Sequence, residues 1–201
     1  YVKASNGETN DAFGASLALS SDGTTLAVGA PGEPSIRTGV NADQHVNNAP
    51  NSGAVYVFTH EGSAWVQQVY IKSSNSEAED QFGSAIALSA DGNTMVVGTP
   101  LESSHATGIN GSQSDNSAAY SGTAYVLTRS GSTWVQQAYV KAPNTDANDQ
   151  FGGSVALSGG AGGRPLVLAV GALNEASNAT GVNTGDQADN SVPGSGAVYL
   201  Y

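Results

Sequence analysis

The sequence contains no cysteine, few basic residues and no long hydrophobic run. Without cysteine the chain can form no disulfide bond, no thiolate metal site and no cysteine nucleophile. The 6 Lys and Arg stand against 17 Asp and Glu, a formal net charge of -11 that repels phosphate backbones, so we expect no nucleic-acid partner. No window approaches the roughly 18 uninterrupted apolar residues that a membrane-spanning helix needs. We therefore expect no membrane insertion.

Glycine is abundant, and the chain repeats itself. The 26 Gly residues and a charged fraction of 11% suit a turn-rich β protein better than a helical one. Tyr1, Tyr70 and Tyr139 are separated by 69 residues each, and three Phe-Gly pairs keep the same step. The third unit is longer because "SGGAGGRP" replaces the tighter turns "SSDG" and "SADG", which predicts a lengthened hairpin there.

Each unit contains four short apolar runs bounded by Gly, Asn, Asp or Ser, the pattern of β-strands. In the second unit the runs are "FGSAIALS", "NTMVVGT", "GTAYVLTR" and "TWVQQAYVKA". Asp22-Gly23 and Asp91-Gly92, between the first two runs, are typical of tight hairpin turns. The connection from the second run to the third is long, from about Pro100 to Ser121, and no stretch shows helical periodicity.

Antiparallel pairing of these runs predicts an all-β fold of three four-stranded sheets, each one a blade of a β-propeller. The blade units are approximately residues 11–74, 80–143 and 149–201 of a single segment, 1–201. Because successive strands alternate in direction, the long second-to-third connections of all three units are expected at one end, opposite the tight hairpins. We call this end the long-loop face.

The two ends of the chain interrupt the repeat. Tyr1 aligns with Tyr70 inside a fourth strand, whereas Tyr201 aligns with Leu127 near the end of a third strand. We therefore expect the last blade to be completed by residues 1–5 or by a neighbouring chain. Three blades are fewer than the four or more of ordinary propellers, so we expect a partial propeller, either a segment of a longer array or half of an oligomer.

The Phe-Gly pairs and a later Gly-Ala-Pro motif carry a resemblance to a known family. The later motif reads "GAP" at 29–31, "GTP" at 98–100 and "GAL" at 171–173. The chain resembles the FG-GAP repeat proteins, which include integrin α-subunit propellers and many bacterial surface and secreted proteins. The resemblance implies a β-propeller and an extracellular or cell-surface location. The repeat signature, with the Asp two residues before each Phe, is Asp11, Phe13, Gly14, Asp80, Phe82, Gly83, Asp149, Phe151 and Gly152.

Calcium is the cofactor that the resemblance suggests, but its usual loop is absent. In integrins an Asp-rich loop between the first two strands holds Ca²⁺, whereas this chain has "SSDGTT" or "SADGNT" there. The long loops instead align Glu, Asp and amide oxygens, hard ligands that suit Ca²⁺, although the first unit has Val46 at the Asp position. The predicted ligands are Glu102, Asp115, Asn116, Glu175, Asp189 and Asn190. Alternatively, these side chains hydrogen-bond the loop backbone and fix its shape.

The Asp residues of the signature are interpreted as turn anchors. An Asp side chain readily closes a local turn by accepting a backbone N–H bond. The Phe residues that follow are expected to pack in the core or between blades rather than to stack on a ligand.

The sequence predicts a non-enzymatic extracellular binding or adhesion module whose long-loop face contacts a protein or glycan ligand. The three histidines, His45, His60 and His105, fall at unrelated positions of the repeat, and none lies beside a second His or a spaced carboxylate. The alternatives are a structural subunit of an extracellular fibre or coat, and a propeller enzyme. Self-association or further blades are expected to cover the end blades, because open sheet faces and edges aggregate.

Overall fold

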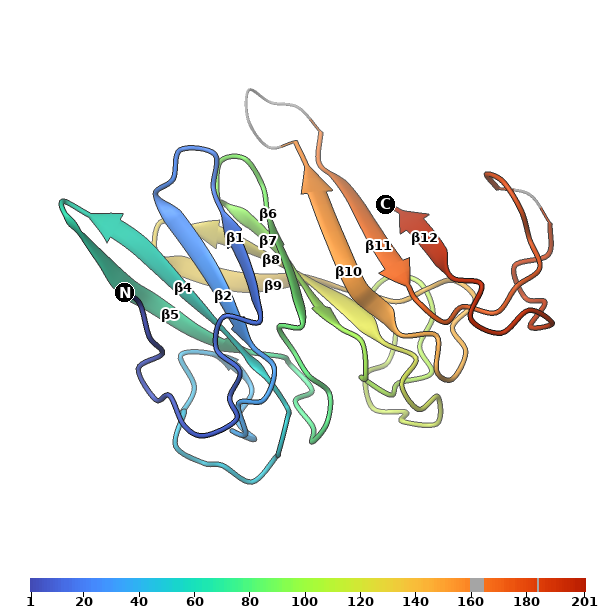
Figure 1. The fold of residues 1–201 in the computed structure, drawn as a ribbon, viewed down its shortest axis with the longest axis horizontal. Coiled ribbons are helices and arrows are strands. Elements are labelled where there is room, and N and C mark those ends of the chain that lie inside the picture. Colours follow the sequence, from blue (N-terminus) through green and yellow to red (C-terminus); the bar gives the residue numbers. More distant parts are fainter. Residues whose placement is uncertain (160–164, 184) are drawn as a thin grey trace.

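The computed structural model describes residues 1–159, 165–183 and 185–201, and this part of the chain is all-β, as predicted (Figure 1). No helix among these residues is long and apolar enough to cross a membrane. The lengthened hairpin predicted in the third unit falls on residues 160–164, outside the described residues. The strands are β1 (Ser16–Leu19), β2 (Thr25–Ala30), β3 (Gly39–Val40), β4 (Ala54–Glu61), β5 (Ala64–Lys72), β6 (Ala85–Leu88), β7 (Thr94–Thr99), β8 (Thr123–Ser130), β9 (Thr133–Val140), β10 (Phe151–Ser158), β11 (Val167–Ala172) and β12 (Ala197–Leu200).

The strands form three antiparallel sheets, one for each repeat unit. Blade 1 has the order β1-β2-β4-β5, with the short β3 from its long loop added beside β5. Blade 2 is the four-stranded sheet β6-β7-β8-β9, and blade 3 has three described strands in the order β10-β11-β12. The open edge of β12 therefore lies where the other two blades carry their fourth strand.

Tight hairpins occupy one end of the blades and the long loops the opposite end (Figure 1). In the first hairpin Gly23 has a φ of 69°, and its N–H donates to the carbonyl of Ser20 at 2.9 Å. Asp22 supports the turn because its Oδ1 accepts hydrogen bonds from the Ser20 hydroxyl and the Thr24 N–H. These hairpins fix the register of the strands that they join.

Two hydrophobic cores lie between neighbouring blades. The first joins Val55, Val57 and Ile71 of blade 1 to Met95 and Val97 of blade 2. The second, between blades 2 and 3, contains Val96, Ala124, Val140, Ala142, Phe151, Leu168, Val170 and Ala172. Successive residues of one strand point to opposite faces, so alternate positions of β7 serve different cores. Each inner sheet face is thus buried against the next blade.

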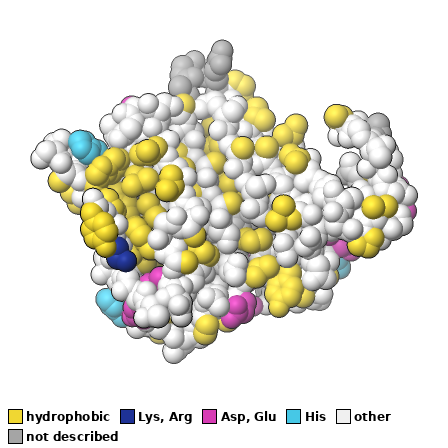
Figure 2. All heavy atoms as spheres, in the orientation of Figure 1, with side chains coloured by type: hydrophobic (Ala, Val, Ile, Leu, Met, Phe, Trp, Pro, Cys, Tyr) yellow, Lys and Arg dark blue, Asp and Glu magenta, His cyan; other side chains and the backbone are white. Residues whose placement is uncertain are grey.

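A third cluster covers the outer face of blade 1, which has no described sheet beyond it. Its centre is Val28, Tyr56 and Phe58, and Val2 and Ala4 from the start of the chain pack against it. Hydrophobic side chains gather on this side of the molecule (Figure 2). Within the described residues, 1–5 pair with no strand, so in a single chain they do not complete blade 3.

Neighbouring blades also touch through backbone atoms at glycine positions. Gly53 forms an isolated parallel bridge with Phe82, and Gly122 does the same with Phe151. A Cβ atom at either glycine would lie 2.1 Å from the carbonyl oxygen of that Phe, and both glycines have positive φ. No side chain can be added there without moving the blades apart.

Candidate functional site

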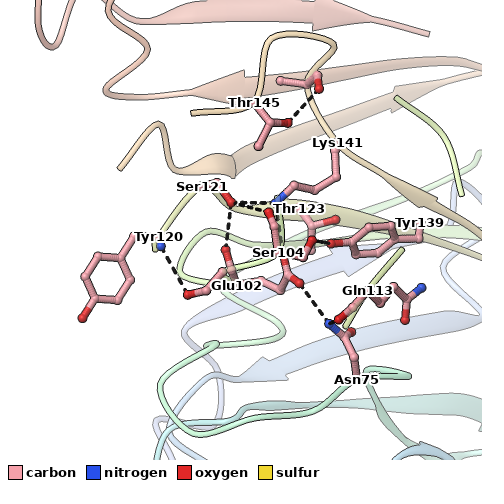
Figure 3. Close-up of polar contacts among 12 residues, drawn as sticks. Asn75, Glu102, Ser104, Gln113, Tyr120, Ser121, Thr123, Tyr139, Lys141 and Thr145 are labelled. Atoms are coloured by element: carbon pink, nitrogen blue, oxygen red, sulfur yellow. Dashed lines mark hydrogen bonds and ion pairs between the residues drawn. The ribbon is translucent and has the colours of Figure 1, made fainter. Parts of the chain in front are cut away.

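A buried polar cluster lies beneath the long loop of blade 2 (Figure 3). The Glu102 side chain pairs with Lys141 at 3.0 Å, and both side chains are at most 1% exposed. The ammonium of Lys141 also donates to the Ser121 hydroxyl at 2.7 Å, and the side-chain amide of Asn75 donates to the other Glu102 oxygen at 2.9 Å. We call this cluster of Asn, Glu, Ser and Lys the glutamate clamp.

Blade 1 contains the same clamp. Glu33 pairs with Lys72 at 2.9 Å, Lys72 donates to the Ser52 hydroxyl at 2.7 Å, and Asn6 donates to Glu33 at 3.1 Å. A tyrosine hydroxyl in turn donates to the Asn side-chain oxygen in each blade, from Tyr56 in blade 1. Because a buried charge is costly unless it is paired and hydrogen-bonded, the clamp holds the start of the long loop onto the fourth strand.

Blade 3 holds most of the clamp but not the lysine. Asn144 donates to Glu175 at 3.1 Å, and the Tyr199 hydroxyl donates to Asn144, as in the other blades. The two ion pairs found among the described residues belong to blades 1 and 2. Glu175 is nevertheless 2% exposed.

Burial changes the titration of the groups around the clamp. It lowers the pKa of Lys72 and Lys141, while the charges of Glu33 and Glu102 work in the opposite direction. Burial also raises the pKa of Asp80 to about 7, against the hydrogen bond that its carboxylate accepts from the Glu77 backbone. The cluster thus combines charges that are strongly desolvated and firmly bound to one another.

A second set of hydrogen bonds ties each long loop to the link that enters its blade. In blade 2 the Asn116 amide donates to Glu77 at 2.7 Å, and the Ser74 hydroxyl donates to Gln113 at 2.6 Å. The same Asn contact recurs in the other blades as Asn47 with Glu8 and Asn190 with Asp146. The loop is therefore fixed at both of its sides, by the clamp and by the link.

In the structure the predicted calcium ligands have separate partners within the protein. Glu102 is engaged by Lys141, whereas Asp115 is exposed and accepts the backbone N–H of Ser117 at 3.1 Å. In blade 3, Asp189 likewise accepts the N–H of Ser191 at 2.8 Å. The described residues contain no group of three or more Asp, Glu or His that could hold a metal ion. These hydrogen bonds and the ion pair favour the alternative that the side chains fix the loop.

Calcium binding stays a prediction that thermal melting can test. We expect the same midpoint with millimolar Ca²⁺ and with chelator, because Glu102 is already neutralised by Lys141 and Glu175 already accepts hydrogen bonds from Ser177 and Asn144. A ligand specific for the folded state would add about 2.7 kcal/mol at a hundredfold excess over its Kd. A calcium-dependent rise that the double variant Asp115→Ala, Asp189→Ala abolishes would restore the predicted site.

The signature residues lie in the turns and cores where each blade begins. Asp11, Asp80 and Asp149 each accept the backbone N–H of the residue three positions earlier, at 2.7 to 2.9 Å. Phe82 and Phe151 are fully buried, whereas Phe13 on the outer face of blade 1 is half-buried. Phe82 packs edge-on against a buried tyrosine ring of its own blade, with 5.4 Å between ring centroids.

The sequence profile of the FG-GAP repeat matches residues 2–58, 65–127 and 134–201. The chain belongs to the FG-GAP repeat family. Repeats of this family are typical of extracellular proteins with propeller-type binding modules. No curated relative matches the chain. Each matched FG-GAP segment after the first begins in the fourth strand of one blade and ends in the third strand of the next.

The sequence analysis does not predict the lysines and asparagines of the clamp in this FG-GAP chain. The clamp lysines, Lys72 and Lys141, follow the 69-residue step, as do Asn6 and Asn75. A lysine that recurs at the same position, at the end of the fourth strand of blades 1 and 2, is therefore a sequence signal for a buried ion pair. The pairing was hidden because each lysine lies 39 residues beyond its glutamate.

Proposed function

We propose that this FG-GAP chain is a non-enzymatic extracellular binding module that holds a protein or glycan ligand on its long-loop face. The support is a set of loops that lie at one end of the blades and are fixed before any ligand arrives. A fixed surface loses less conformational entropy when it binds.

Tyr120 is the observation that carries this proposal. It lies in the long loop of blade 2 with 44% of its surface exposed, and its ring points away from the clamp (Figure 3). Its φ is 57°, a left-handed conformation that is unfavourable for a bulky side chain. The equivalent positions of the other blades hold Asn51 and Gly194, residues that accept this conformation easily.

The backbone on both sides of Tyr120 is held firmly. Its N–H donates to the Ser103 hydroxyl at 3.3 Å, and its carbonyl accepts the N–H of Gln150 in the next link at 3.0 Å. An exposed aromatic ring is thus presented on a rigid, locally strained backbone. Tyrosines in such positions often dominate the energy of a protein interface.

Replacing Tyr120 with asparagine tests the proposal. We expect the variant to melt at the same temperature or higher, because asparagine relieves the backbone strain. Ligands that the unmodified chain selects from a glycan array and from a displayed peptide library should bind about 30-fold more weakly or worse. Val66→Thr, on the exposed surface of β5, is the matched control and should bind normally. Unchanged binding by the Tyr120 variant, or no ligand on either array, would contradict the proposal.

A further inference from the structure

Part of the long loop of blade 2 lies along the outer edge of β9. The Lys141 N–H donates to the carbonyl of Gly108 at 2.8 Å, and the Asn110 N–H donates to the carbonyl of Tyr139 at 2.7 Å. We call residues 107–110 the edge strap. The strap covers backbone groups that an uncovered strand edge would leave open.

Asn110, at the end of the edge strap, holds its side-chain carbonyl in place and leaves its side-chain nitrogen unengaged. The residue is exposed, with a φ of 58°, and its Oδ1 accepts the Tyr139 N–H at 3.0 Å. Among the residues that the structure describes, none forms a hydrogen bond with the side-chain nitrogen of Asn110 or with the N–H of Gly111. The two nitrogen atoms on either side of the Asn110 Cγ are thus available for reaction.

An asparagine that precedes glycine can rearrange without an enzyme. The glycine amide nitrogen loses its proton to hydroxide and bonds to the asparagine Cγ, and the bond from Cγ to Nδ2 breaks, so that this nitrogen takes up a proton and leaves as ammonia. Water then opens the five-membered ring at one of its two carbonyls and gives aspartate or isoaspartate. One water is consumed, one ammonia is released, and nothing is oxidised or reduced. Glycine favours the reaction because no Cβ hinders ring closure.

The hydrogen bond to Tyr139 assists this reaction at Asn110. Negative charge develops on Oδ1 as the amide nitrogen attacks Cγ. The Tyr139 N–H already lies 3.0 Å from this oxygen and is fixed by the backbone of β9. A fixed donor at the atom where charge develops lowers the barrier of a carbonyl addition.

Blade 1 repeats this geometry without the glycine. Asn41 has a φ of 53°, its N–H donates to the carbonyl of Tyr70 at 2.7 Å, and its Oδ1 accepts the Tyr70 N–H at 3.1 Å. The next residue is Ala42, whose Cβ hinders ring closure. Blade 1 therefore has the held carbonyl but not the reactive neighbour.

The other Asn-Gly pair of the chain, Asn6-Gly7, has the glycine but not the unengaged side chain. The Asn6 amide donates to Glu33 and to the carbonyl of Gln44, at 3.1 Å in each case, and its Oδ1 accepts the Tyr56 hydroxyl. Loss of the side-chain nitrogen would break these bonds of the glutamate clamp. Of these three asparagines, Asn110 alone combines a following glycine with an unengaged side-chain nitrogen.

We propose that Asn110 is a site of spontaneous deamidation and isomerisation in the folded chain. Isoaspartate adds one carbon to the main chain at the end of the edge strap, so the hydrogen bonds of the strap to β9 lose their register. The adjoining Lys141 carries the ammonium of the glutamate clamp. The modification therefore adds a negative charge to the long-loop face and loosens the backbone beside a buried ion pair.

Peptide mapping of the aged chain provides the first test. Trypsin places the three asparagines in separate peptides, residues 4–37, 38–72 and 73–129. After incubation at mildly alkaline pH and body temperature, the mass of the 73–129 peptide should rise by about 1 Da, and fragmentation should locate the change at Asn110. Asn6 and Asn41 should react about tenfold more slowly or less. The rate at Asn110 should increase with pH, because the attacking amide must first lose its proton.

The change also has a structural readout. Deuterium uptake at the Lys141 amide should be about tenfold faster or more in the aged chain, because the strap that binds this N–H is loosened. The Lys72 amide, at the same position of blade 1, should exchange as before ageing.

Unfolding and one matched variant make the test specific. In urea, Asn6 and Asn110 should react at similar rates, because each precedes glycine and the clamp is lost; folding should then slow Asn6 about tenfold or more and leave Asn110 as fast or faster. Ala42→Gly should bring Asn41 to about the rate of Asn110, and circular dichroism checks that this variant is folded. The proposal is overturned if Asn110 reacts in urea but stays intact in the folded chain, or if Asn6 reacts as fast as Asn110 in the folded chain. An unreactive Asn41 in folded Ala42→Gly would also contradict it.

Discussion

Replacing Lys141 with methionine is expected to lower the free energy of unfolding by about 3–5 kcal/mol. The lysine is completely buried, and its ammonium contacts both Glu102 and the Ser121 hydroxyl. Methionine fills a similar volume but leaves the Glu102 carboxylate charged, desolvated and without a counter-ion. The loss is measured by urea denaturation followed by circular dichroism.

Two further variants separate the charge effect from a packing effect. Adding Glu102→Gln to Lys141→Met should recover part of the loss, because glutamine removes the unpaired charge and still accepts the hydrogen bond from Asn75. Lys3→Met is the matched control, since Lys3 holds the same repeat position but is exposed. This variant should change stability by less than about 0.5 kcal/mol. A loss below about 1 kcal/mol for Lys141→Met would show that the clamp does not support the fold.

Phe82→Ala is expected to destabilise the chain by about 3–5 kcal/mol. The Phe82 ring is fully buried in the core between blades 1 and 2, where it packs edge-on against Tyr125. Alanine would leave a cavity between two blades that are joined by backbone contact at Gly53, so the walls cannot close around it easily. Thermal and urea unfolding report the loss.

The repeat supplies a graded control for this change. Phe13→Ala removes the equivalent ring from the half-buried outer face of blade 1, so it should cost clearly less than Phe82→Ala. Phe151→Ala, from the core between blades 2 and 3, should resemble Phe82→Ala. Equal losses for Phe13 and Phe82 would contradict the assignment of the first as an end position and the second as an inter-blade position.

The strands and hairpins could be predicted from the sequence because their signals are local. Alternating apolar residues mark strands such as β7, and Asp91-Gly92 marks the hairpin that precedes it. The 69-residue step then fixed the three units and their order. The two-residue strand β3 was not foreseen, since its pairing with β5 depends on how the long loop folds back.

The polar site was harder to predict because its partners are distant along the chain. The alignment of the long loops grouped Glu102 with Asp115 as metal ligands, although the structure turns the glutamate inward to Lys141. Sequence spacing does not show which way a loop carboxylate points. The strained backbone of Tyr120 was equally hidden, because a positive φ at tyrosine follows from tertiary contacts rather than from the residue type.

The backbone contacts at Gly53 and Gly122 have a consequence for the arrangement of the three blades. Where a bridge joins Gly53 to Phe82, neighbouring blades are separated by main-chain thickness alone, and a Cβ atom would already collide at 2.1 Å. Side chains of different size can widen or narrow the gap elsewhere between two sheets, but they cannot change this spacing. The angle between neighbouring blades is thereby restricted at the glycine contacts where their backbones meet. Alanine at Gly53 would act as a wedge, and its effect would be a changed curvature of the array rather than a local defect within one sheet.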